Sequence, residues 1–370
     1  MKKLTYIAIV ALAALTACSK VEMDSYGPDR KITFQAAAYV PQTKANTSLW
    51  GEFQAFTAKA FLHAEGYTDE TQDFFGTAGE TITPYQSDGT AATAETNTSY
   101  WGPSHDYYWP KSANSYINFI AWYDKNASVH GAPASSSETS LSWTGYTVQA
   151  DDNLLYADEA WHYNVNTDND AQYTTPTDAV RSGVPMLFHH ALAQVAFKAS
   201  ATNATSGVYT RSVAIKSFSL SNVYSTGSLV LTNAGSATTA AVPWEISGNG
   251  WTSLADAIDM TATIASGSPI SVTGDAVNLI PMRTVLPQAV TGSMMLNIEY
   301  DIVTKKNGAD FSVEHISFSK RLSDLVSVIT EWEMGHKVTY TLVFNLSTDS
   351  ILIQPTLQNW DYNGGNVTVE

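Results

Sequence analysis

The chain has 370 residues, of which 44% are hydrophobic and only 15% are charged, and its formal net charge is −16. This length exceeds one ordinary hydrophobic core and suits two domains, while the apolar content excludes wholesale disorder. The acidic balance excludes nucleic acid as an expected partner and argues against charge-driven binding to anionic membranes. Few charges with plentiful Tyr and Trp are typical of an extracellular β-protein rather than a cytosolic enzyme.

The first seventeen residues have the form of a secretory signal peptide. Two lysines precede an apolar stretch, Leu4 to Leu15, that is too short to span a membrane. The segment Leu15-Thr16-Ala17-Cys18 matches a lipobox, where bacterial lipoproteins are cut before a cysteine that then carries a diacylglycerol. An ordinary signal peptide that happens to end near a cysteine is the alternative. Since Cys18 is the only cysteine and cannot form an internal disulfide, we predict that it is lipidated, in a mature chain of net charge −18.

A polar tether, residues 18–30, is expected to lead into the first strand. Residues 31–40 alternate with the period of two that is typical of a strand with one buried face. The residues predicted to point inward are Ile32, Phe34, Ala36, Ala38 and Val40. The next segment, residues 41–47, is rich in Pro, Asn and Thr and is predicted to be a loop.

Further strands are expected along the whole chain, with turn residues between them. In the first half we predict strands at 49–65, 116–123, 152–157 and 184–200, and a loop at 126–140. In the second half we predict strands at 187–199, 211–220, 227–232, 270–282, 293–304, 311–319, 337–346 and 350–360. Only short helices fit, near 254–257 and 322–325. Spacings of about ten residues favour an all-β protein with Greek-key sandwich topology, divided near residue 186 into domains 31–186 and 187–370.

Motifs for catalysis are missing from the sequence. It contains no Gly-x-Ser-x-Gly, and its only cysteine is expected to carry lipid, so we predict neither an enzyme nor a cofactor. His189 and His190 are adjacent and should point to opposite faces of a strand, one buried and one exposed, rather than share a metal. The segment Asp168-Asn169-Asp170 is similar to the start of a calcium loop but lacks its glycine and terminal glutamate, so a solvated loop is expected and calcium stays open.

Aromatic residues crowd the first half and leave glycan binding as an open alternative. Exposed Trp and Tyr faces stack on sugars, but large β-domains also bury these residues in their cores. The residues concerned are Tyr100, Trp101, Tyr107, Tyr108, Trp109, Trp122, Tyr123, Trp143, Trp161 and Tyr163.

Four segments together resemble the fimbrillin family, the lipoprotein precursors of type V pili in gram-negative anaerobes. They are DNLLYA at 152–157, VPMLFHHALAQVAF at 184–197, WEMGHKVTY at 332–340 and IQPTLQNW at 353–360. With the lipobox and the first strand, the likeness spans most of the chain, apart from residues 66–150. The resemblance implies two tandem transthyretin-like β-sandwich domains.

The resemblance also implies a way of assembly. Family members reach the outer membrane as lipoproteins, and a trypsin-like protease then cuts after a basic residue and releases the first strand, here within residues 31–44. The open groove takes a C-terminal strand of the next subunit by β-augmentation. Where the family often has Thr-Arg-Ala, this chain has Thr43-Lys44-Ala45, so Lys44 is the expected cleavage site. Arg30 is the other candidate, but it precedes the strand.

The C-terminal tail bears on the position in the pilus. It offers two alternating apolar side chains, Val367 and Val369, whereas the removable strand offers five. A poor donor of this kind favours a tip or minor subunit. The expected function is therefore a structural and adhesive subunit of a surface fimbrium, with other fimbrial subunits, the outer membrane and host or bacterial surface ligands as partners. The alternative is a monomeric outer-membrane glycan-binding lipoprotein.

Overall fold

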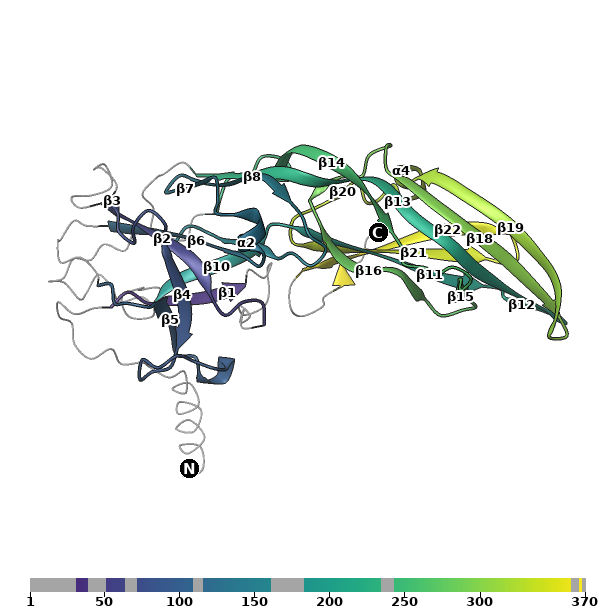
Figure 1. Cartoon of the computed structure of the whole chain (residues 1–370), viewed down its shortest axis with the longest axis horizontal. Coiled ribbons are helices and arrows are strands. Elements are labelled where there is room, and N and C mark those ends of the chain that lie inside the picture. Colours follow the sequence, from purple (N-terminus) through teal and green to yellow (C-terminus); the bar gives the residue numbers. More distant parts are fainter. Residues whose placement is uncertain are drawn as a thin grey trace, which may run out of the picture.

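The computed structural model describes residues 31–38, 51–63, 72–108, 116–160, 183–233, 243–360 and 366–367. Strands dominate it, and the α-helices of the described chain, α2 (Ala127–His130) and α4 (Leu322–Leu325), are one turn each. The all-β prediction is confirmed. The two halves of the chain lie end to end in an elongated molecule (Figure 1). Within the described ranges, no helix has the length and apolar character needed to cross a membrane.

The first half forms a closed ring of seven strands. Their spatial order is β2 (Phe56–His63), β4 (Glu80–Tyr85), β5 (Tyr100–Pro103), β1 (Phe34–Ala38), β10 (Val184–His190), β9 (Leu154–Ala157) and β6 (Tyr116–Asp124). The ring closes because β2 pairs with β4 on one side and with β6 on the other; β3 (Gln72–Asp73) adds to the end of β2. A sandwich was expected here, and the ring differs from it because closure leaves these strands no open edge.

Strand β6 shows how the ring is held to the rest of the molecule. Its residues Ile117, Phe119 and Ala121 pack inside the ring, whereas Ile120 and Trp122 face outward and are also buried. Successive side chains of a strand point to opposite faces, so this strand has apolar contacts on both sides. The continuous apolar run of the strand predicted at 116–123 therefore serves two cores, one inside the ring and one at its junction with the second half.

The second half is built from two sheets that pack face to face. One has the order β16 (Val277–Val285), β11 (Ala193–Thr202), β21 (His336–Asn345), β22 (Ser350–Asn359) and β23 (Asn366–Val367). The other has the order β19 (Ala309–Arg321), β18 (Met295–Lys306), β13 (Tyr209–Thr232), β8 (Ser140–Thr147) and β7 (Ser135–Ser137). Strands β12 (Thr205–Ser206), β14 (Trp251–Thr261) and β15 (Ile270–Val272) also pair with β13. A small separate pair is β17 (Gln288–Ala289) with β20 (Glu331–Trp332).

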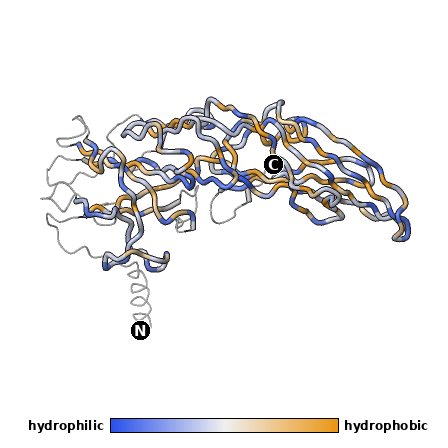
Figure 2. The backbone as a smooth tube through the Cα atoms, viewed as in Figure 1, coloured by the Kyte–Doolittle hydropathy of each residue, from blue (hydrophilic) through white to orange (hydrophobic). Residues whose placement is uncertain are grey.

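Alternating side chains supply the core between these sheets. Figure 2 shows hydrophobic and hydrophilic residues alternating along the long strands of the second half. Phe197 of one sheet contacts Phe218 of the other at 5.2 Å between ring centroids, and Tyr300 contacts Phe344 at 5.0 Å. The apolar residues of this alternation thus form the inner faces of both sheets.

Several element predictions are corrected by the pairing. Residues 211–220 and 227–232 belong to one 24-residue strand, β13, because its two ends pair with different neighbours, β18 and β8. The helix predicted at 254–257 is wrong, since this segment lies in β14 and pairs with β13. The predicted loop 126–140 contains α2 and β7. The helix at 322–325 is confirmed.

A third apolar cluster joins the ring to the second half. Strands β7 and β8 come from the first half of the sequence but pair into the sheet of β13. The indole N–H of Trp244 donates to the carbonyl oxygen of Ala157 at 2.8 Å, and that of Trp251 donates to Ala191 at 2.7 Å. Both tryptophans are buried. The chain itself crosses between β10 and β11, so backbone, side chains and sheet pairing all hold the two halves together.

Candidate functional site

The first strand, β1, is one of the strands that form the closed ring. Strand β1 pairs in parallel with β10 over five residue pairs, from Phe34↔Val184 to Ala38↔Phe188. On its other side it makes a single strand pair with β5, Phe34↔Trp101. The ring would therefore be open between β5 and β10 without β1, and each of those strands would expose a backbone edge.

Side chains of β1, together with that of Ile32 just before it, fill the centre of the ring. Ile32 and Phe34 are fully buried, and Ala36 packs against the same cluster. The Phe34 ring contacts Phe119 edge-on at 5.4 Å between centroids and Phe56 at 6.2 Å. Edge-to-face aromatic contacts of this kind add to the free energy of burying the ring. Ile32, Phe34 and Ala36 thus fill the interior of the ring, and Phe34 has the largest side chain of the three.

The start of the strand is held by polar contacts. The Lys31 ammonium lies 2.5 Å from a carboxylate oxygen of Asp106, and the backbone N–H of Ile32 donates to the carbonyl oxygen of Tyr107 at 2.7 Å. Burial is the largest single influence and lowers the pKa of Lys31, but the hydrogen bond to Asp106 and the interactions with Tyr100 together outweigh it, so the pKa of the lysine is raised.

On the β10 side the backbones approach closely. The N–H of Val184 donates to the carbonyl oxygen of Thr33 at 2.7 Å. Gly183 has a φ of +87°, and a Cβ there would lie 3.1 Å from the carbonyl carbon of Phe34. Glycine is thus required at this position both by its backbone conformation and by the proximity of β1.

The predicted lipidation and processing residues lie outside the described residues. This applies to Cys18, Arg30, Val40 and Lys44, and also to Asp168 and Asp170 of the possible calcium loop. Ala38 is described as a backbone position of β1. The assignments made to these residues remain predictions.

The two adjacent histidines point to opposite faces, as predicted. His190 is buried with Nδ1 3.0 Å from the Asn153 side-chain oxygen, and its ring stacks on Trp360 at 4.3 Å. Burial, followed by the nearby Lys337 charge, lowers the pKa of His190 to about 3, so its imidazole is neutral. His189 is half-buried, with Nε2 2.9 Å from a carboxylate oxygen of Asp158. In the part of the chain that is described, no group of three or more His, Cys, Asp or Glu side chains could hold a metal ion.

Most of the candidate sugar-stacking aromatics that are described belong to cores. Trp101, Trp122 and Trp143 are buried, and only Tyr108 is substantially exposed, at 43%. Trp109, Trp161 and Tyr163 fall outside the described residues. The described tryptophans therefore stabilise the fold rather than present open stacking faces.

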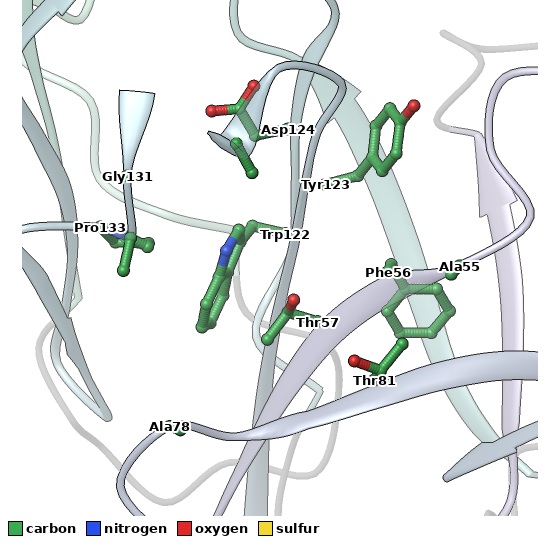
Figure 3. A pocket seen from close by; sticks show the side chains of 12 residues that line it. Ala55, Phe56, Thr57, Ala78, Thr81, Trp122, Tyr123, Asp124, Gly131 and Pro133 are labelled. Carbon is green, nitrogen blue, oxygen red and sulfur yellow. The ribbon is translucent and has the colours of Figure 1, made fainter. Parts of the chain in front are cut away.

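A shallow depression of about 380 Å³ lies on the outside of the ring, beside α2. Its lining includes Trp122, Thr57, Thr81 and Pro133. Figure 3 shows the Trp122 and Thr57 side chains directed into this space, whereas Phe56 and Tyr123 lie on the other side of their strands. Its polar lining consists of hydroxyls and of Asp124, whose carboxylate is paired with the buried His130 ring at 2.9 Å.

An acidic pair at the junction, in which Glu159 is buried and Glu138 is half-buried, had no signal in the sequence analysis. Glu159 follows β9 in the ring, and Glu138 lies between β7 and β8 of the other half. Both carboxylates accept hydrogen bonds from the Asn118 amide, and Glu159 also accepts one from Asn233 at 2.6 Å. Burial, and then the Glu138 charge, raise the pKa of Glu159 to about 8. Because the two residues meet only through the packing of ring on sheet, no local pattern signals the pair.

The described residues thus form a strand-closed ring joined to a pair of facing sheets. The chain matches the family model described as Fimbrillin-like over residues 43–360. This range covers most of the sequence, so the protein belongs to the fimbrillin-like family, as the resemblance indicated. The family is structural rather than catalytic.

One solved structure shares the fold at low sequence identity, and others are similar to a lesser degree. A fimbrial protein from Bacteroides vulgatus is 16% identical with a TM-score of 0.55, and the match covers 90% of this chain and all of that one. A candidate cell adhesion protein from Bacteroides uniformis is 15% identical with a TM-score of 0.43, at 90% and 100% coverage. One from Parabacteroides distasonis is 12% identical with a TM-score of 0.44, at 90% and 98% coverage. None of the curated proteins matches the chain in sequence.

Proposed function

We propose that this protein is a structural and adhesive subunit of a cell-surface fimbrium, made as an outer-membrane lipoprotein anchored at Cys18. The observation that carries the proposal is that β1 alone connects β5 to β10, whereas the other strands of the ring pair with one another directly. Proteolysis after Lys44 would separate this strand covalently from the rest of the ring. A strand from another subunit can then take its place, because backbone hydrogen bonds and alternating side chains are re-formed by the newcomer.

The contacts of β1 support removal followed by replacement. The strand has a ladder on β10 but one pair on β5, so few backbone bonds must be exchanged on that side. Ile32 and Phe34 occupy fully buried positions, which an incoming strand must refill with side chains of similar size. Cleavage after Arg30 would remove the tether but leave β1 in place.

A tip or minor position is part of the proposal. The described residues of the tail, Asn366 and Val367, pair with Gln358 and Leu357 of the chain's own β22. A tail used within its own sheet is a poor strand donor, so the subunit would accept a strand but not pass one on. We further propose that the chain divides near residue 186 and that the pair of facing sheets is the transthyretin-like unit of the second half.

N-terminal sequencing of the protein from sheared surface filaments tests this function. We expect the chain in filaments to begin at Ala45, with surface filaments depleted of this subunit in a Lys44→Ala strain. A Cys18→Ala strain should lose acyl labelling and outer-membrane retention of the precursor. Recovery of the protein only as a lipid-anchored monomer that keeps residues 31–44 would contradict the proposal and favour the glycan-binding alternative.

A further inference from the structure

The outer strand of the second half ends its sheet. Strand β19 pairs with β18 along its whole length, from Lys306↔Ala309 to Met295↔Arg321. Among the described residues no strand pairs with its other edge. All of its residues are exposed except Ile316 and Phe318, which are half-buried. Figure 1 shows β19 along the outer side of the second half, away from the ring. A long exposed edge is a template for another strand.

The direction of its backbone groups can be assigned. The N–H of Leu322 donates to the carbonyl oxygen of Met294 at 2.9 Å, so these two residues form a hydrogen-bonded pair. The same register continues without a shift from Met295↔Arg321 to Thr304↔Ser312. In an antiparallel ladder, alternate residues direct both N–H and C=O to the same neighbour. Even-numbered residues of β19 therefore bond to β18. Odd-numbered residues direct their backbone groups outward, and these are Val313, His315, Ser317, Ser319 and Arg321.

We propose that β19 is a pairing edge for a second copy of this chain, with the two β19 strands antiparallel about a two-fold axis at Ser317. In this register the odd residues form the hydrogen-bonded pairs between copies. The even residues form the non-hydrogen-bonded pairs, whose side chains lie closer together. Ile316 then faces Phe318 of the second copy, and Glu314 faces Lys320 of the second copy. The two-fold axis makes each contact twice.

The charges of the strand argue for a second copy as the occupant. The first part of β19 is acidic, with Asp310 and Glu314, and its end is basic, with Lys320 and Arg321. A strand with this pattern complements itself only when it runs antiparallel. Neither Glu314 nor Lys320 has an ion pair among the described residues, so both are available to a partner. Opposite charges directly across an antiparallel pair are favourable.

Neighbouring registers fit less well. Centring the axis on His315 places this residue opposite itself, although the Lys216 ammonium already lies 3.2 Å from its Nδ1, and sets Glu314 against Ile316 of the second copy. Centring it on Ile316 sets Glu314 against Phe318. Only the Ser317 register pairs apolar with apolar and acid with base on the same face.

Sedimentation velocity of the purified full chain tests the proposal, in a Cys18→Ala background so that lipid cannot mediate association. This edge is independent of β1 and of the proposed function, so either can fail alone. We expect a monomer–dimer equilibrium. Ser317→Pro should abolish it, because proline removes an outward N–H without touching the ladder to β18. Ser317→Ala, which keeps that N–H, should dimerise like the parent.

Charge-reversal variants test the proposed register between the two β19 strands. Glu314→Lys and Lys320→Glu should each weaken the dimer by about tenfold or more, since each creates two repulsive pairs. The double variant should restore it, because the pairs are then reversed but again complementary. Circular dichroism and the thermal midpoint check that every variant is folded. A parent that stays monomeric at about 1 mM, a Ser317→Pro variant that dimerises normally, or a double variant without rescue would each overturn the proposal.

Discussion

The ring and the two-sheet half differ in whether they leave an unpaired strand edge. The ring has none, because β1 closes the space between β5 and β10. The sheet of β13 ends openly at β19, whose exposed face is polar and charged apart from Phe311 and Val313. An open sheet can accept a neighbour as it stands, whereas a closed ring must first lose a strand. Under the proposed assembly, proteolysis is therefore needed for the ring but not for the open sheet.

The largest expected effect is on the ring. Phe34→Ala removes the central aromatic side chain and should destabilise the protein by about 3–5 kcal/mol, since a cavity is added to the lost burial. Urea denaturation measures this free energy of unfolding. Gln35→Ala on the exposed face of the same strand is the matched control and should change it by less than about 0.5 kcal/mol. Equal effects of the two variants would mean that β1 does not fill the ring.

The joint between the two regions is expected to respond to pH. The folded-state pKa of Glu159 is raised to about 8 by burial and by Glu138, so the native state holds a proton that the unfolded chain releases near its ordinary, lower pKa. Its contribution to stability is full below that lower pKa and is lost as pH rises through about 8. Between pH 5 and pH 8.5 we expect a loss on the order of 2–4 kcal/mol.

Urea denaturation at several pH values measures this dependence. Glu159→Gln should flatten it, because the amide does not titrate. The exposed Glu299→Gln in β18 is the control and should keep the dependence of the parent. A Glu159→Gln variant with an unchanged pH profile would show that another group is responsible.

A smaller effect is expected from the close approach of β10 to β1. Gly183→Ala should cost about 1–3 kcal/mol, because alanine is strained at positive φ and its Cβ meets the backbone of Phe34. Gly145→Ala in β8 shares the positive φ but meets no atom within 4 Å, so it should cost only about 1 kcal/mol. The difference in denaturation midpoints isolates the contact with β1. No difference would mean that β1 does not pack tightly on β10.

The smallest effect concerns the entry of β1. Lys31→Ala removes the ion pair with Asp106 and should cost about 0.2–1 kcal/mol, because both side chains are partly exposed. The difference from the parent should shrink at 1 M salt, which screens exposed pairs. A salt-independent loss above about 2 kcal/mol would point to packing of the lysine stem instead.

Local alternation was enough to predict the strands but not their neighbours. The period of two over residues 31–40 placed Ile32 and Phe34 correctly in a core. Nothing local shows that β1 pairs in parallel with β10, about 150 residues later, or that β2 pairs with β6 to close the ring. The helix expected near Leu254 failed because pairing with β13 overrides weak helical preference. The Glu138–Glu159 pair likewise arises from tertiary packing alone.

Strand exchange measured directly on the ring tests the central claim. The precursor is cut after Lys44 and incubated with an isotopically labelled peptide of residues 31–44, and native mass spectrometry records its incorporation. We predict that the cut chain takes up the labelled peptide, that uncut Lys44→Ala does not, and that a peptide carrying Phe34→Ala competes poorly. A cut chain that retains its original strand against excess peptide, or an uncut chain that incorporates the peptide equally well, would contradict the account.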